Sequence, residues 1–113
     1  MQNGISLLTL TVLATGALTA NRFVGHGGAT AAAAGNALGV SRTAAAIGER
    51  APVDVIGTTV VETGGALAAG ALIEVDASGR AVTKSAGVAV ARLAPGETAS
   101  AAGQFVEVIL LPN

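Results

Sequence analysis

The sequence predicts an all-β fold, a small β-sandwich or barrel built from two similar β-meander repeats with little helix. Residues that favour strands, chiefly Val, Ile and Thr, occur in short runs, and Gly interrupts them every few positions. These runs follow one another at intervals of roughly ten residues, which is typical of small antiparallel sandwiches and barrels. Patterns of the first half also return in the second half, which indicates that one supersecondary unit is used twice.

The repeat is clearest at its two ends. Gly16-Ala17-Leu18 returns as Gly65-Ala66-Leu67, 49 positions later. Val53-Asp54-Val55-Ile56 returns as Val106-Glu107-Val108-Ile109, 53 positions later, and a short insertion after Gly96-Glu97 would account for the difference. We expect one compact domain whose parts are an N-terminal strand or arm (residues 1–14), a first β repeat (15–57) and a second β repeat (58–113).

The N-terminal segment predicts a half-buried strand. Ser6–Leu13 alternates between two faces, one of which carries Leu8, Leu10 and Val12. A secretory signal fits less well, because Met1–Gly4 has no positive charge and the apolar run is too short to span a bilayer. We therefore expect a strand of the mature protein.

Four further strands are expected in matching pairs. The early strands of the two repeats are Arg22–Val24 and Leu72–Val75, and the late strands are Pro52–Ile56 and Gln104–Leu111. Each pair occupies the same point in its repeat, so the order of elements in one half predicts the other.

Turn residues separate these strands. Asp76-Ala77-Ser78-Gly79 is the clearest hairpin signal, because Asp and Ser cap turns and Gly accepts positive φ. Pro95-Gly96-Glu97 predicts a second turn, with Ile47-Gly48-Glu49 as its partner in the first repeat. Gly25–Gly35 is consistent with a mobile loop or with a close contact between small residues. Thr43–Ile47 is compatible with one helical turn.

Composition favours association with other proteins. Hydrophobic residues make up 51% of the chain and charged residues only 12%. A surface so poor in charge favours burial against neighbours, in an oligomer or a larger assembly. The net charge is −1 and the six basic residues are scattered, so we do not expect nucleic acid as a partner. We also expect no membrane partner and no small-molecule substrate.

Candidate chemistry is sparse. His26, the only histidine, lies in Gly25-His26-Gly27-Gly28 without a Cys, His or acidic residue nearby, and this glycine pattern lacks the lysine of a phosphate-binding loop. Glu74 and Asp76 are explained more simply as charges at a strand edge than as an acid–base pair. The chain has no cysteine. We therefore expect a protein that is not an enzyme, with no catalytic residue, cofactor or metal.

The order of elements in the second repeat is its most distinctive feature. It reads Gly65-Ala66-Leu67-Ala68-Ala69-Gly70, a strand to Val75, the Asp76–Gly79 turn, Gly87-Val88-Ala89, Ala94-Pro95-Gly96-Glu97 and Phe105-Val106-Glu107-Val108. In this order the chain resembles the small decoration or cement proteins of tailed-phage capsids, over about residues 15–110.

The resemblance implies a structural virion protein that binds the outer surface of a phage capsid and stabilises the head. It implies a homotrimer at three-fold and quasi-three-fold positions, made in the host cytoplasm, whose partners are the major capsid protein and its own copies. The alternative is another β-rich virion or cell-surface interaction module, such as a fibre base, a tail-associated domain or an adhesin.

Contacts in such proteins run through a terminal arm and loops, which here points to Met1–Leu13 and Gly25–Gly35. Strand addition to a neighbour would satisfy the backbone groups of the first segment. The candidate capsid or subunit contacts are Ile5, Leu7, Leu8, Leu10, Val12, His26 and Thr30.

Overall fold

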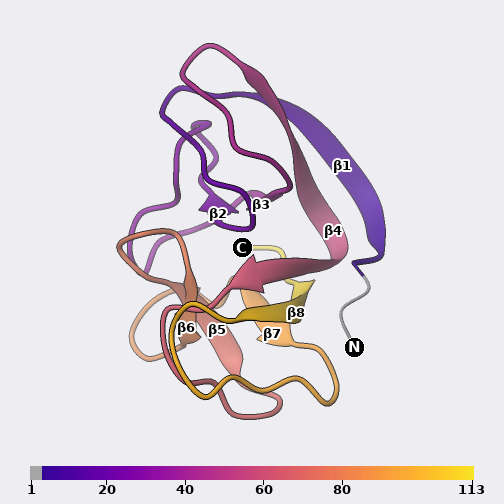
Figure 1. Ribbon diagram of the computed structural model, residues 1–113, viewed down its shortest axis with the longest axis vertical. Coiled ribbons are helices and arrows are strands. Elements are labelled where there is room, and N and C mark those ends of the chain that lie inside the picture. The colour runs from indigo at the N-terminus through magenta and orange to yellow at the C-terminus, as the bar shows by residue number, and fades with distance from the viewer. Residues whose placement is uncertain (1–3) are drawn as a thin grey trace.

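The computed structural model describes residues 4–113 as one eight-stranded antiparallel sheet that curls into a nearly closed barrel (Figure 1). The strands are β1 (Ser6–Leu13), β2 (Phe23–Val24), β3 (Gly39–Ser41), β4 (Arg50–Glu62), β5 (Leu72–Val75), β6 (Ala81–Thr83), β7 (Ala91–Leu93) and β8 (Phe105–Leu110). No helix occurs in this part of the chain. The predicted all-β fold is confirmed.

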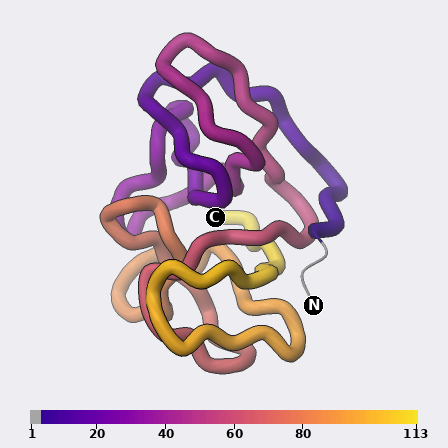
Figure 2. Tube along the Cα trace, viewed as in Figure 1, coloured from indigo at the N-terminus to yellow at the C-terminus, as the bar shows by residue number. Residues whose placement is uncertain are grey.

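Strand β4 joins the two halves of the molecule. The sheet order is β2-β3-β4-β8-β7-β5-β6, and β1 pairs with β4 outside this path. The first part of β4 pairs with β1 and β3, whereas its last part, Thr58–Glu62, pairs with β8. In Figures 1 and 2 the N-terminal half lies above the C-terminal half, and β4 passes from one to the other.

The two halves make corresponding hydrogen bonds. Leu18 exchanges two backbone hydrogen bonds with Ala45, of 2.8 and 3.0 Å, and Leu67 exchanges two with Ala99, also of 2.8 and 3.0 Å. Leu18 and Leu67 stand at the same point of the two predicted repeats. The boundaries of those repeats stay a prediction, because β4 continues through residues 57 and 58 without a break.

The repeat partner of Gly48 differs from the expected one. Gly48 has positive φ and its N–H donates to the Ala14 carbonyl; Gly103 has positive φ and its N–H donates to the Thr63 carbonyl. Gly103 therefore holds the position of Gly48, and the match to Gly96 is wrong. The recurring Gly-Glu pair suggested that match, whereas the position is defined by a hydrogen bond to the end of a strand.

Most predicted strands and turns are present. Ser6–Leu13 and Leu72–Val75 have the predicted bounds. The Asp76–Gly79 segment turns β5 into β6, with the Asp76 N–H donating to the Arg80 carbonyl (2.9 Å). Strand β4 is longer than the predicted Pro52–Ile56, and the helical turn suggested for Thr43–Ile47 is absent.

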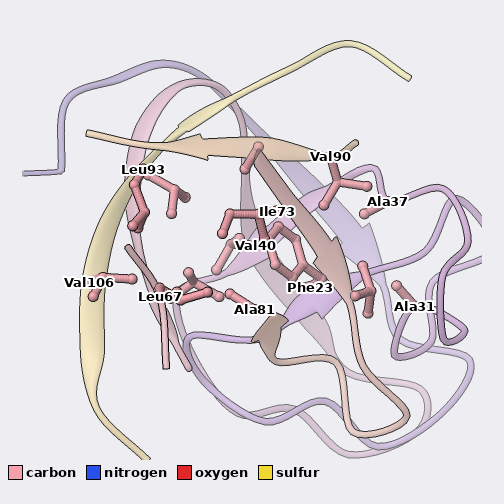
Figure 3. Packing of buried hydrophobic residues seen from close by; sticks show 14 of the residues in the cluster. Phe23, Ala31, Ala37, Val40, Leu67, Ile73, Ala81, Val90, Leu93 and Val106 are labelled. Atoms are coloured by element: carbon pink, nitrogen blue, oxygen red, sulfur yellow. The ribbon is translucent and has the colours of Figure 1, made fainter. Parts of the chain in front are cut away.

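The hydrophobic core is shared between the halves. The larger of two clusters contains Phe23 and Val40 from the first half together with Ile73 and Val106 from the second half, and Phe23 lies beside Ile73 (Figure 3). A smaller cluster lies beside β1 and includes Val24 and Val53. Because one cluster takes its side chains from both halves, neither half has a complete core of its own.

Candidate interaction surface on strand β1

Strand β1 is an edge strand that presents apolar side chains to solvent. It pairs with β4 and, among residues 4–113, with no other strand. Ile5 is 63% exposed, Leu7 75% and Leu13 49%. Single exposed apolar residues are ordinary, but several on one strand make that strand a candidate contact surface.

The face of β1 that points toward the core is only partly covered. Val12 packs against the smaller cluster beside Val53. Leu10, two residues earlier on the same face, remains 39% exposed, and Leu8, at an irregularity in the strand register, is 41% exposed. Both faces of β1 therefore offer apolar area to a neighbour.

The backbone of β1 leaves hydrogen-bonding groups open along its outer edge. The Ala14 N–H donates to the Glu49 carbonyl (2.8 Å), which fixes the phase of the β1–β4 ladder. Because inward and outward pairs alternate along an antiparallel ladder, the N–H and C=O groups of Thr9, Thr11 and Leu13 point away from β4. The Leu13 carbonyl faces the backbone of Gly28 in the same chain, so the open groups are those of Thr9 and Thr11 and the Leu13 N–H. The strand carries no charge and no proline, which are the usual protections of an exposed edge.

Polar contacts fix β1 against β4. The Asp54 carboxylate is 4% exposed and accepts three hydrogen bonds. The donors are Thr9 Oγ1 (2.9 Å) on β1, Thr59 Oγ1 (2.9 Å) on β4 and Arg42 Nε (2.8 Å) after β3. The carboxylate thus ties three segments together, and β1 is presented as an ordered strand of the sheet.

The residue before β1 is fixed as well. The Ile5 N–H donates to Thr58 Oγ1 (2.8 Å), and the Thr58 N–H donates to the Ile5 carbonyl (2.9 Å). Of the predicted N-terminal strand or arm, Ser6–Leu13 is therefore a strand, whereas Met1–Asn3 lies outside the described residues.

A cavity of about 290 Å³ lies next to β1 and contains another of the predicted contact residues, His26. Ile56 connects the two features, since it pairs with Leu8 of β1 and also lines the cavity. The remaining wall residues are Ala37, Leu38, Val55, Leu110, Leu111, Pro112 and Asn113. The lining is mostly apolar, which suits an apolar side chain better than a charged ligand.

Thr30 lies apart from this surface. It pairs with Val24 in the first half, and its methyl group lies beside Gly79 of the β5–β6 turn. The structure therefore brings together Ile5, the β1 residues and, through Ile56, His26, but it places Thr30 at the junction between the halves.

Some exposed apolar residues were absent from the predicted set. Leu13 ends the alternating run of β1, so its position was a usable signal. Ile56 (49% exposed) and Phe105 (46%) gave no such signal, because their exposure depends on which strands cover their faces.

A group of charged side chains lies between the halves. Glu62 binds Arg22 (3.2 Å) and lies 3.9 Å from Arg80, which in turn binds Asp76 (3.2 Å). Near the β6–β7 loop, hydrogen bonds from the backbone lower the pKa of Glu74. These contacts join segments of the chain.

The described residues offer surfaces and few reactive groups. No three His, Cys, Asp or Glu side chains among residues 4–113 lie close enough to hold a metal ion. Within the same range there is no helix with the length and apolar character needed to cross a membrane. What the arrangement can do is bind, through β1 and the cavity beside it.

Comparison with known proteins identifies the family. The family model for phage cement proteins matches residues 1–110. The chain belongs to this family. It is a structural protein of the phage virion and is located at the outer surface of the capsid, as the resemblance of the second repeat implied.

A solved structure has the same fold. The head fiber gp8.5 N base of bacteriophage phi29 matches with a TM-score of 0.72 and 19% sequence identity, over 92% of this chain and 93% of that chain. At this identity the match shows that the two proteins share a fold. A search of curated proteins finds no match.

Proposed function

We propose that the protein binds the outer surface of a phage capsid as a homotrimer, at three-fold and quasi-three-fold positions, and stabilises the head. It contacts the major capsid protein and its own copies, and it catalyses no reaction. The family match over residues 1–110 is the observation that carries this proposal.

The exposed apolar residues support a role in binding. Nine large hydrophobic side chains are exposed among residues 4–113, and five of them lie on β1 or directly before it. Burial of apolar area stabilises a complex by about 25 cal/mol per Å² before the costs of association. A symmetric oligomer repeats each contact, so individually weak contacts add up. The proposed contact residues are Ile5, Leu7, Leu8, Leu10 and Val12, with His26 and Thr30 as a second group.

A base for a head fibre is the second candidate, because the phi29 head fiber base has the same fold. Both candidates place the protein on the capsid, and they differ in whether it carries a projecting polypeptide. Electron microscopy of decorated heads distinguishes them, since a fibre base would show a projection above the capsid surface and a cement protein would not.

A binding experiment tests the leading proposal. Capsids that lack the protein are sedimented with increasing concentrations of wild type or of Leu7→Asp. Leu7 is 75% exposed, so the variant should fold, but a carboxylate would have to lose its water in the contact. We expect saturable binding of the wild type and at least about tenfold weaker binding of the variant.

Phe105→Asp is the matched control, since it places the same charge on a partly exposed apolar residue of β8. It should bind like the wild type. If Leu7→Asp bound capsids as tightly as the wild type, the proposed contact through β1 would be wrong. If the wild type did not bind capsids at all, the proposed function itself would be wrong.

A further inference from the structure

Within the chain, a loop of the first half binds the outer edge of β4. The Glu62 N–H donates to the Asn21 carbonyl (2.8 Å), and Asn21 Nδ2 donates to the Val60 carbonyl (3.0 Å). Beside them, Arg22 forms an ion pair with Glu62 (3.2 Å). The outward backbone groups of Val60 and Glu62 are therefore satisfied by Asn21, and the side chains of Arg22 and Glu62 pair beside them.

Strand β1 occupies in the first half the position that Thr58–Glu62 of β4 occupies in the second half. The Ala14 N–H donates to the Glu49 carbonyl, and the Thr63 N–H donates to the Gln104 carbonyl. The strand registers agree as well: Val12 pairs with Ala51 as Val61 pairs with Val106, and Leu10 pairs with Val53 as Thr59 pairs with Val108. Val53 therefore corresponds to Val108, and its expected match to Val106 is wrong. In this correspondence Leu13 matches Glu62, and Thr11 matches Val60.

The loop that binds this edge also has a counterpart. Asn21 matches Gly70, and both have positive φ, 62° and 73°. Each lies three positions after the leucine of a matching bridge, Leu18–Ala45 or Leu67–Ala99. Gly70 is exposed, and a Cβ atom placed on it would meet nothing within 4 Å. The space above this loop is open to a neighbour.

The two contacts are not reciprocal within one chain. The Gly70 carbonyl accepts a hydrogen bond from Arg92 Nη1 (3.2 Å) in the second half, while the outer edge of β1 lies on the first half (Figure 2). A two-fold relation between the halves would have brought Gly70 to β1. The relation is instead head to tail, so a matching contact at β1 would have to come from another copy.

We propose that the loop Ala68–Ala71 of a second copy binds the outer edge of β1, with the Leu13 N–H donating to the carbonyl of that copy's Gly70. This contact continues the interface that already joins the halves of one chain. The proposal rests on the proposed homotrimer and specifies how its copies meet. In a ring of three chains, three such contacts within chains would alternate with three between chains.

The chemistry at the two positions is consistent with a contact between copies. Inside the chain the neighbouring side chains are the charged pair Arg22 and Glu62. The matching residues are Ala71 and Leu13, which are both uncharged, so the contact between copies buries apolar area and leaves no charge unpaired. Leu13, 49% exposed in the single chain, gains a neighbour.

Cross-linking tests the contact directly. The chain has no cysteine, so Leu13→Cys combined with Ala71→Cys provides the only two thiols. A short bifunctional thiol reagent, applied in solution and on decorated capsids, should join chains into a ladder that ends at three. Leu13→Cys with Ala77→Cys, on the exposed β5–β6 turn, is the control and should give no such ladder. If Leu13→Cys with Ala71→Cys gave no more cross-linked dimer and trimer than the control, the proposed contact would be wrong.

A second pair of variants tests the hydrogen bond. Leu13→Pro removes the outward N–H together with the leucine side chain, which an edge strand tolerates at such a position, and Leu13→Ala removes the side chain but keeps the N–H. We expect the dissociation constant of the trimer to be roughly tenfold higher for Leu13→Pro than for Leu13→Ala. Native mass spectrometry on folded protein measures both constants. Gly70→Asn should strengthen the trimer, because the amide can bind the Thr11 carbonyl as Asn21 binds that of Val60.

The outcomes separate this contact from the proposed function. Trimers that are unchanged by Leu13→Pro overturn the contact and leave the trimer and capsid binding standing. Wild-type protein that is monomeric both in solution and on capsids overturns the homotrimer and this contact together, while saturable capsid binding would still support the virion role.

Discussion

Asp54 is the residue on which the position of β1 most depends. Its carboxylate is buried and accepts hydrogen bonds from Thr9, Thr59 and Arg42. A buried carboxylate is tolerated when such donors satisfy it, and its replacement leaves those donors without an acceptor.

We expect Asp54→Asn to lower the free energy of unfolding by about 2 kcal/mol, because the amide group turns a donor toward donors. Thr9→Val removes a single donor and should cost about 1 kcal/mol. Urea denaturation measures both. If Asp54→Asn were as stable as the wild type, the carboxylate would not hold the three segments together.

The carboxylate of Glu74 makes the hydrogen bonds of the β6–β7 loop sensitive to pH. Ser85 N–H (2.6 Å) and Gly87 N–H (3.1 Å) donate to Glu74 Oε1, and these bonds hold the pKa of Glu74 below its ordinary value of 4.5. A lowered pKa in the folded state means that the stabilisation is present above the unfolded pKa and is lost as the pH falls through the folded one.

The amide resonances of Ser85 and Gly87 should therefore titrate together, with a midpoint below 4.5, in NMR spectra recorded over a pH series. In Glu74→Gln the two amides should no longer follow this titration. A shared midpoint at or above 4.5 would contradict the role given to these bonds.

At the scale of elements, the close approach of β3 to β4 requires glycine. A Cβ atom at Gly39 would overlap the carbonyl oxygen of Asp54, which is backbone and cannot turn aside. Gly39→Ala should therefore lower the free energy of unfolding by about 3 kcal/mol. Gly27→Ala is the control, since a Cβ there meets nothing within 4 Å, and should change stability by less than about 0.5 kcal/mol. Calorimetry that found both variants equally stable would refute the requirement.

Long or strongly alternating elements could be predicted from the sequence, and short ones could not. Ser6–Leu13 and the Asp76–Gly79 turn carry their own signals. Strands β3 and β7 have three residues each, and they form because a neighbouring strand offers hydrogen bonds. The length of β4 escaped prediction because Gly57 interrupts its pattern, although glycine suits the strand here: its φ is positive, and a Cβ atom would overlap the carbonyl oxygen of Ile5.

At the scale of the molecule, the apolar, uncharged character of β1 was predictable, but the exposure of both its faces and the cavity beside it were not, since a half-buried strand was expected. The alternation of β1 and its lack of charge can be seen in the consecutive residues Ser6–Leu13 of the sequence. The cavity is assembled from His26, residues 37–38, residues 55–56 and the last four residues of the chain. Such a combination follows only from the topology, so sequence reasoning could name His26 but could not give it neighbours.

The continuity of β4 has a mechanical consequence. Strands β1 and β8 lie antiparallel along successive parts of one polypeptide, so a force that draws the two halves apart along β4 loads many ladder hydrogen bonds at once, in shear, and does not open them one by one. The covalent backbone of β4 carries the same load across the junction. A protein built in this way is expected to resist extension along β4, which would suit the proposed role of stabilising the capsid.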